Sequence, residues 1–326
     1  MRYSSVISLN KAAAEIVERM TAKAEQLGLA VSRLSNGAQI VDAGVDVPGS
    51  LNAGRLFSEA CMGGLGDVQF RMLSLGGLTL PGVEVNVEQP MLACMAAQYA
   101  GWEVDFPGSA ESEAYSAMGS GPARALYRGD PVFEIVDYVD PAEVAVLALE
   151  SRSLPSEAAV SWIAEKCRIS PGCLSILVSP TASLVGSVQI AARIVETGLH
   201  KMHEVGFDIG TVISGFGSCP LAPVAGDDLK AIGRTNDAVL YGGRAWYTVE
   251  TDDALIQDVI EVLPSLASSD YGVPFGELFE RYGGNFYQID PLLFSPAELS
   301  ITNATSGRTF RAGHVDAAMV EKVLLG

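Results

Sequence analysis

The chain has 326 residues, of which 48% are hydrophobic and 18% charged, a composition typical of a globular protein and long enough for two domains. Its formal net charge is −18, from 39 acidic and 21 basic residues, and no stretch gathers lysine and arginine into a cluster. These values argue against nonspecific nucleic-acid binding and against binding to an anionic membrane surface, because both need a basic face.

Cysteine and histidine usage limits the chemistry that the chain can support. None of the five cysteines forms a Cys-x-x-Cys pair, so we expect a reducing compartment and no disulfide framework. The N-terminal sequence lacks the apolar core of a secretion signal, and we therefore expect a cytoplasmic protein with no membrane association. His200 and His203 lie three residues apart, but a solvated helix end is favoured over a metal site because no zinc-type spacing accompanies them.

The first third of the chain predicts alternating helices and strands. In order, the pattern indicates a helix over 8–28, a hairpin over 29–45, a short helix near 50–61, a strand at 83–87 and a helix over 90–101. Ser8 or Asn10 can cap the first helix, and Gly28 can end it. Asn36 and Gly37 predict a tight two-residue turn, because both can adopt the positive φ angles that it needs.

The middle and last thirds predict helices that cover a sheet. We expect a buried strand within 140–151, a helix over 155–168, a buried strand from 174, a long helix over 184–205, a Gly- and Pro-rich loop at 215–228 and a hairpin over 305–313. The alternation of strand and helix indicates a mixed α/β (α+β) fold with helices packed on mixed sheets.

Two glycine-rich stretches are ambiguous. In residues 114–126, Ser120 and Gly121 precede a proline that can open a helix, whose free N–H groups could bind an anion or a polar ring edge. The stretch lacks the third glycine of a dinucleotide site and the lysine of a P-loop, so a simple tight turn is favoured. In 215–228, a structural loop and a loop approached closely by a ligand are equally supported.

The polar run GRTND at 233–237 also has two interpretations. Thr235, Asn236 and Asp237 carry donors and acceptors that could bind the edge of a heterocycle. Asn236 and Asp237 are equally good helix caps, and on the residues alone the cap is favoured.

The stretch QIAARIVETG at 189–198 places four polar side chains on one helical stripe, namely Gln189, Arg193, Glu196 and His200. Periodicity favours a solvated face with an ordinary Arg–Glu ion pair. However, the polar side of this helix is mostly serine, glutamine and small residues, which suits a helix that lines a cleft.

Several stretches match one protein family in the family's own order and cover nearly the whole chain. They are NGAQIVDAGV, AGRLFSEACMGGLGDV, QPMLACMAAQYAGW, AMGSGPARAL, LALES, PTASLVGSVQIAARIVETGLHK, GRTNDAVLYGG, LPSLASSDYGVPF and FYQIDPLLFSPA. Together they resemble methenyl-tetrahydromethanopterin cyclohydrolase of methanogenic archaea and methylotrophic bacteria.

The resemblance implies a fold and a reaction. It implies two α/β domains that enclose an active-site cleft, here divided into 1–88 plus 225–326 and 89–224, usually in a homotrimer. The implied reaction is the reversible hydrolysis of the methenyl bridge of a reduced pterin carrier to the 5-formyl derivative, with no metal or redox cofactor.

The resemblance also implies site residues. The family's Arg-x-x-Glu motif falls on Arg193 and Glu196, which we expect to be catalytic: Glu196 would accept a proton from the attacking water, and Arg193 would orient Glu196 and keep it ionised. The substrate-binding residues would be Ser120, Gly121, Gln189, Thr235, Asn236 and Asp237. An anionic tail of the carrier could be received by a local cation such as Arg124, Arg234 or Lys201.

Two rival functions remain open at this point. One is a protein that holds a reduced pterin without chemistry, and an Arg193–Glu196 pair argues against it. The other is the same chemistry on a folate-type carrier, although the sequence has no dinucleotide fingerprint of a folate cyclohydrolase–dehydrogenase.

Overall fold

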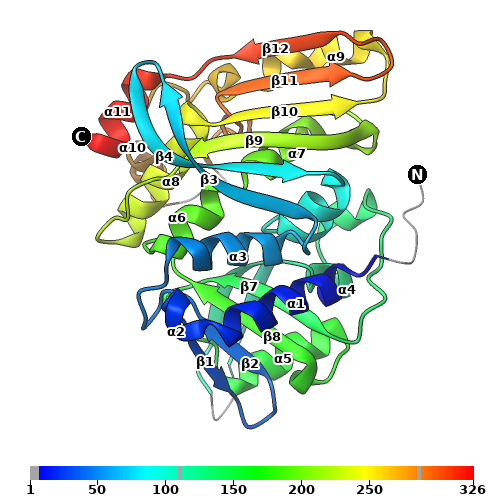
Figure 1. Ribbon diagram of the computed structural model, residues 1–326, viewed down its shortest axis with the longest axis vertical. Helices are drawn as coiled ribbons and strands as arrows, with labels where there is room; N and C mark the ends of the chain where they lie inside the picture. Colours follow the sequence, from blue (N-terminus) through cyan, green and yellow to red (C-terminus); the bar gives the residue numbers. More distant parts are fainter. Residues whose placement is uncertain (1–6, 109–111, 285–287) are drawn as a thin grey trace. The chain divides into compact units, whose positions relative to one another are not determined.

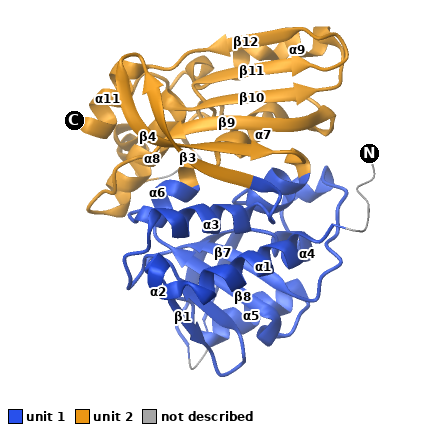
Figure 2. Cartoon of the chain, viewed as in Figure 1, with its two compact units in different colours: residues 1–66, 92–189 blue, residues 67–91, 190–326 orange. Residues whose placement is uncertain are grey.

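A computed structural model describes residues 7–108, 112–284 and 288–326 (Figure 1). The chain forms two compact units, unit 1 from Met1–Gly66 and Leu92–Gln189 and unit 2 from Asp67–Met91 and Ile190–Gly326 (Figure 2). The first two residues of the stretch FYQIDPLLFSPA lie outside the described residues. No helix within the described ranges is long and apolar enough to span a bilayer.

Unit 1 is built on a six-stranded sheet in the order β1–β2–β8–β7–β6–β5. The strands are β1 (Ala30–Arg33), β2 (Gln39–Asp42), β5 (Trp102–Phe106), β6 (Tyr115–Ser120), β7 (Ala145–Glu150) and β8 (Leu174–Ser179). The central strands β2, β8 and β7 are parallel, and the flanking strands are antiparallel. Because β7 and β8 are buried, they read in sequence as continuous apolar runs.

Helices cover both faces of this sheet. On one face, α1 (Leu9–Ala22), α2 (Ala24–Leu27) and α3 (Leu51–Cys61) pack on Val41, Val146 and Leu177. On the other face, α5 (Glu157–Cys167) packs on Ile40, Leu147 and Ile176. The side chains of each strand alternate between these two apolar layers.

Unit 2 is built on a second mixed sheet, in the order β12–β11–β10–β9–β4–β3. Its strands are β3 (Gly66–Leu75), β4 (Leu78–Val87), β9 (Val212–Pro220), β10 (Arg244–Val249), β11 (Glu298–Asn303) and β12 (Thr309–Gly313). Only the β10–β11 pairing is parallel among the pairings described. The helices α7 and α8 pack against β9, and α10 and α11 pack against α8.

The remaining elements complete both units. The helices not yet bounded are α4 (Arg124–Tyr127), α6 (Leu184–Ala191), α7 (Ile194–Glu204), α8 (Asp228–Gly242), α9 (Asp253–Val259), α10 (Phe275–Arg281) and α11 (Ala317–Leu325). Short helical turns are η2 (Pro131–Glu134), η3 (Pro171–Cys173), η4 (Ile209–Thr211), η5 (Ile260–Val262), η6 (Ser265–Ala267) and η8 (Pro291–Leu293). The mixed α/β (α+β) class expected from the sequence is confirmed.

The helix ends and the turn predicted in the first third of the chain are confirmed in part. The Ser8 hydroxyl caps α1 by accepting from the Lys11 N–H, and Gly28 ends the helical segment with a φ of 67°, but the helix is interrupted at Lys23. The hairpin over 29–45 forms, yet the two-residue turn is wrong. Of Asn36 and Gly37, only Gly37 has a positive φ, at 89°. The Leu34 N–H donates to the Ala38 carbonyl, so the loop contains three residues and not two.

The segment 90–101 differs from an ordinary α-helix. It forms a π-helix, η1 (Met91–Gln98), and the Tyr99 N–H donates to the Cys94 carbonyl at 2.7 Å, five residues back. The predicted end at Gly101 therefore comes several residues too late.

The expected glycine-rich loop at 215–228 is wrong over its first half, which belongs to β9. A Cβ at Gly215 would lie 2.5 Å from a methyl of Val195, and one at Gly217 would lie 2.7 Å from a methyl of Ile194. These glycines are therefore needed for α7 to pack closely on the strand, which removes the argument that they admit a ligand.

A third glycine and a tyrosine complete this contact. A Cβ at Gly198 of α7 would lie 2.2 Å from the Tyr247 hydroxyl, which donates to the Val195 carbonyl at 2.7 Å. Tyr247 lies on β10 and is fully buried. The N-terminal turns of α7 are therefore fixed against both β9 and β10.

The compact units divide the chain differently from the expected domains, 1–88 plus 225–326 and 89–224. The cause is strand pairing that sequence patterns do not reveal. The N-terminal β2 pairs with β8 from the middle of the chain, and β4 pairs with β9.

We expect Gly198→Ala to destabilise the protein by about 1 to 3 kcal/mol, although alanine favours helix, because the new methyl group would overlap the Tyr247 hydroxyl. Tyr247→Phe removes that hydroxyl, so the double variant should lose less stability than the two single changes together. Equilibrium denaturant unfolding measures these differences. Gly226→Ala is the control, since a Cβ there meets nothing within 4 Å, and a Gly198→Ala variant as stable as this control would contradict the packing argument.

Candidate active site

The predicted long helix over 184–205 is interrupted next to Arg193, one of the two expected catalytic residues. The helix α6 ends at Ala191 and α7 begins at Ile194, with Arg193 as the residue that precedes α7. The Arg193 N–H donates to the Ile190 carbonyl at 3.0 Å, and the Arg193 carbonyl accepts from the Thr197 N–H at 2.8 Å. Two residues, Ala192 and Arg193, therefore separate the two helices, so the expected single helix over 184–205 does not form.

Arg193 and Glu196 form a largely buried ion pair at this break. The guanidinium nitrogen Nη1 and the carboxylate oxygen Oε2 lie 3.8 Å apart, and the two side chains are only 14% and 7% exposed. Glu196 lies in the first turn of α7, where the partial positive charge of the helix N-terminus favours a carboxylate. The solvated-face interpretation of this segment is therefore wrong for Glu196.

Gln189 makes a separate contact in unit 1. Its side-chain amide donates to Oε2 of Glu150 at 3.1 Å, and the Thr181 hydroxyl donates to Oε1 of the same carboxylate. Glu150 is the last residue of β7. Sequence analysis did not select Glu150 or Thr181, although each follows a predicted buried strand, the position at which α/β proteins often place functional side chains.

Ser120 and Gly121 lie at the end of β6 and have structural partners. Gly121 has a φ of 101°, its N–H donates to the Ala97 carbonyl at 2.8 Å, and a Cβ would lie 3.2 Å from the Val146 carbonyl oxygen. The Ser120 hydroxyl is buried, 3.7 Å from the Cys61 sulfur. The positive φ and close backbone approach agree with the tight-turn interpretation.

Thr235, Asn236 and Asp237 lie inside α8, which is capped by Asp227 through the Lys230 N–H. The favoured interpretation, that Asn236 and Asp237 cap the helix that follows them, is therefore wrong. The Thr235 hydroxyl donates to the Ala231 carbonyl at 2.8 Å, and the Asn236 amide donates to the Ile232 carbonyl at 2.8 Å.

Asp237 instead caps a different helix. Its Oδ1 accepts from the N–H of Phe275, the first residue of α10, at 2.8 Å. Burial is the largest influence on this carboxyl and raises its pKa to about 7; the Phe275 N–H lowers the pKa, Glu277 raises it and Lys322 lowers it. The group therefore titrates near neutral pH.

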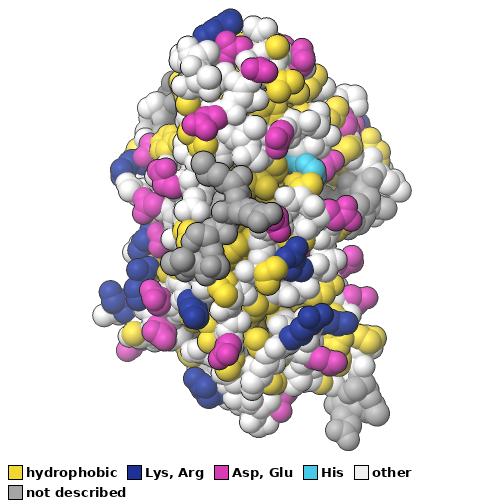
Figure 3. Space-filling view, turned by 90° about the vertical axis from the view of Figure 1, so that its right-hand side faces the viewer, with side chains coloured by type: hydrophobic (Ala, Val, Ile, Leu, Met, Phe, Trp, Pro, Cys, Tyr) yellow, Lys and Arg dark blue, Asp and Glu magenta, His cyan; other side chains and the backbone are white. Residues whose placement is uncertain are grey.

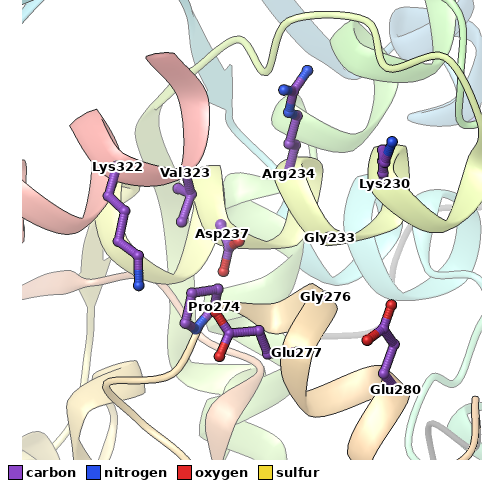
Figure 4. A pocket seen from close by; sticks show the side chains of 10 residues that line it. All are labelled: Lys230, Gly233, Arg234, Asp237, Pro274, Gly276, Glu277, Glu280, Lys322 and Val323. Carbon is purple, nitrogen blue, oxygen red and sulfur yellow. The ribbon is translucent and has the colours of Figure 1, made fainter. Parts of the chain in front are cut away.

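A pocket of about 340 Å³ opens beside Asp237 (Figure 4). Its lining comes from α8, α10 and α11 and consists of Lys230, Gly233, Arg234, Asp237, Pro274, Gly276, Glu277, Glu280, Lys322 and Val323. Gly233 and Gly276 allow close approach, since a Cβ at Gly233 would lie 3.2 Å from the Gly276 Cα. The lining contains three basic and three acidic side chains, so neither sign of charge outnumbers the other.

The three cations considered for an anionic tail differ in access. Arg124 is fully buried and forms a bidentate pair with Asp130, and Lys201 is buried and donates to the Leu292 carbonyl. Burial lowers the pKa of Lys201 to about 8, against an opposite effect of Asp290. Arg234, by contrast, lines the pocket beside Asp237.

The surface and the potential metal ligands complete the description. On the face in Figure 3, lysine and arginine side chains are interspersed with aspartate and glutamate and form no extended basic surface. Within the ranges that the structure covers, no three His, Cys, Asp or Glu side chains are grouped so that they could hold a metal ion.

Comparison with known proteins gives consistent matches over the whole length. The sequence model of the family described as Cyclohydrolase (MCH) matches residues 8–324. Two proteins named methenyltetrahydromethanopterin cyclohydrolase are each 43% identical to this chain. The match to the protein from Methylobacterium sp. (strain 4-46) covers 97% of both chains, and the match to the protein from Methanocaldococcus jannaschii covers 98% of both. The protein of that name from Methanospirillum hungatei is 44% identical over 95% of this chain and 96% of its own.

The raised pKa of Asp237 predicts a distinct dependence of stability on pH. Between about pH 4 and 7 the folded protein holds a proton that the unfolded chain has released, so this contribution is full at low pH and is lost as pH rises through about 7. Relative to Asp237→Asn, whose Oδ1 can still accept from Phe275, the wild type should lose up to about 1.4 kcal/mol of stability per pH unit between pH 5 and 7.

Denaturant unfolding at a series of pH values measures this difference. Asp258→Asn, at an exposed position on α9, is the matched control. The difference in unfolding free energy between the wild type and this variant should not fall with pH in the same way. A difference between wild type and Asp237→Asn that stays constant from pH 5 to 8 would show that Asp237 is ionised throughout.

Proposed function

The chain belongs to the methenyltetrahydromethanopterin cyclohydrolase family, and from that premise we propose that it hydrolyses the methenyl bridge of this reduced pterin with Glu196 as the proton acceptor and Arg193 as its orienting partner. The family assignment supplies the reaction. The roles of the two residues are proposed from their geometry and from the match of Arg193-x-x-Glu196 to the family motif.

The reaction needs a base and a negative charge near one carbon. The methenyl carbon is bonded to two nitrogens that share a positive charge, so it is electrophilic. The oxygen of water bonds to this carbon and loses a proton to Glu196. The bond from the carbon to the second nitrogen then breaks as that nitrogen gains a proton and the new hydroxyl group loses its own, which leaves a formyl group on the first nitrogen and releases one proton overall. A carboxylate beside the carbon both accepts the proton and offsets the substrate's charge.

The burial of the Arg193–Glu196 pair is the observation that supports these roles most. A buried charge pair is costly to form and adds little stability over apolar residues, so its presence at a helix break favours a functional role. A carboxylate oxygen can accept two hydrogen bonds, so an ion pair with Arg193 is compatible with a further bond from water. Arg193 limits the orientations of Glu196 through its charge and shape.

The other members of the proposed site follow from the resemblance. Ser120, Gly121, Gln189, Thr235, Asn236 and Asp237 remain the proposed substrate-binding residues. We propose no redox cofactor, because the one-carbon unit has the same oxidation state in the methenyl and formyl forms, and no metal, as the family resemblance implies. A homotrimer is expected from the family, and light scattering would test for three times the 34.2 kDa mass of one chain.

Glu196→Gln should lower kcat by about two decades or more and leave KM within a few-fold, because the amide keeps the shape but cannot accept the proton. Loss of the methenyl chromophore's absorbance measures the rate, with methenyl-tetrahydrofolate as a second carrier. Glu204→Gln on the same helix is the control, since Glu204 is exposed and pairs with His200. Near-normal turnover by Glu196→Gln would exclude this role, and tight binding without turnover by the wild type would favour a pterin-carrier protein.

Arg193→Lys should lower kcat about tenfold or more, because lysine keeps the charge but loses the planar group with several donors that fixes the carboxylate. The same absorbance assay measures the change, and a normal melting temperature would show that the fold is intact. Full activity in this variant would mean that a single positive charge is sufficient beside Glu196.

A further inference from the structure

The pocket between α8, α10 and α11 has no part in the proposed proton transfer, and every residue that lines it belongs to unit 2. Its volume of about 340 Å³ lies within the usual range of small-molecule sites, roughly 300 to 1,000 Å³. A ligand with only one sign of charge would meet as many like charges as opposite ones in its lining. A ligand that carries both signs can be paired with both sets of side chains.

Asp237 is a buried acid that faces this pocket. Its side chain is 2% exposed, and Figure 4 shows its carboxyl group directed from α8 toward Pro274. Oδ1 accepts from the Phe275 N–H, and no donor among the described residues reaches Oδ2, so that oxygen keeps its capacity to accept hydrogen bonds. A buried acid beside a pocket, with a pKa raised to about 7 chiefly by burial, is typical of a functional site.

Arg234 supplies a positive charge one helical turn from Asp237. It precedes Asp237 by three residues on α8, which is a rise of about 4.5 Å along the same side of the helix. Arg234 is not among the groups that shift the pKa of Asp237, whereas Lys322 of α11 is, so Arg234 and Asp237 do not form an ion pair. Lys230, a further turn back, already pairs with Asp227 at 3.7 Å. Arg234 is therefore the cation of α8 that is best placed to share a ligand with Asp237.

We propose that this pocket binds a small zwitterion, an organic molecule whose ammonium group is held by Asp237 and whose carboxylate is held by Arg234. The planar guanidinium group suits a carboxylate, because it can donate two parallel hydrogen bonds. Glu277 and Glu280 of α10 add negative charge to the lining for the ammonium end. This binding goes beyond the proposed function, and it gives Asp237 a ligand other than the reduced pterin.

Three probes of equal chain length test this binding by titration calorimetry with the full chain at pH 8. γ-Aminobutyrate carries both charges, butylamine only the positive one and butyrate only the negative one. We expect γ-aminobutyrate to bind at least about tenfold more tightly than either of the others, and Asp237→Asn and Arg234→Gln each to weaken its binding about tenfold or more. Asp258→Asn on α9, outside the pocket, is the control and should bind as the wild type does. Equal binding of butylamine, no binding of any probe, or unchanged binding by either pocket variant overturns the assignment.

The dependence of binding on pH gives a readout that a merely structural effect would not move. The charged side chains that line the pocket with Asp237 are Lys230 and Arg234 of α8, Glu277 and Glu280 of α10, and Lys322 of α11. An ammonium group binds the ionised form of Asp237, so the affinity for γ-aminobutyrate should fall as pH drops below about 7, by up to about tenfold per pH unit. The residual binding by Asp237→Asn should stay constant from pH 8 to 6, because the amide does not titrate. An equal slope in the wild type and this variant would contradict the role of Asp237.

Competition separates this pocket from the substrate site, since the family resemblance counts Asp237 among the substrate-binding residues. We expect saturating γ-aminobutyrate to leave the KM for methenyl-tetrahydromethanopterin unchanged. A KM that rises in proportion to γ-aminobutyrate at constant kcat would show that the two molecules share Asp237, and would overturn a separate ligand. A wild-type protein that does not convert the methenyl carrier would overturn the proposed function alone, because the calorimetric test does not depend on turnover.

Discussion

The packing of α7 onto β9 and β10 is the constraint on which the candidate active site depends. Gly215 and Gly217 remove side chains from the strand surface where α7 approaches, and the Tyr247 hydroxyl binds the Val195 carbonyl in the first turn of the helix. Glu196 is the next residue after Val195, so its backbone is fixed by the core of unit 2. The role proposed for Glu196 would depend on such a rigid support, because a catalytic group has to be held within about half an ångström of its working position.

The proposed binding residues differ in how much of their hydrogen-bonding capacity remains for a ligand. Thr235 and Asn236 donate to carbonyl groups of their own helix, and Gly121 is explained by its backbone conformation and close packing. Gln189, by contrast, donates to a carboxylate that keeps acceptor capacity, and Asp237 borders a pocket. The structure therefore ranks residues that the sequence motif presents as equals, since a motif records identity and not the partners already engaged.

Sequence patterns predicted the elements well wherever one apolar face or one cap decides the local structure. Ser8 and Gly28 act at helix ends as expected, and the buried strands β7 and β8 read as continuous apolar runs. The failures have a common cause in long-range contacts. The break at Arg193 contains no proline or glycine, the glycines of β9 are dictated by a helix from elsewhere in the chain, and Asp237 caps a helix that begins almost forty residues later.

The interleaved order of the two units has a consequence for synthesis on the ribosome. The β3–β4 hairpin leaves the ribosome long before β9, the strand with which β4 pairs, because residues 92–189 of unit 1 intervene. During that interval the hydrogen-bonding edge of β4 has no native partner, a state in which strands can associate with other chains. Unit 1 can meanwhile complete its sheet with β8, so its fold can form before the sheet that supports Glu196 is finished.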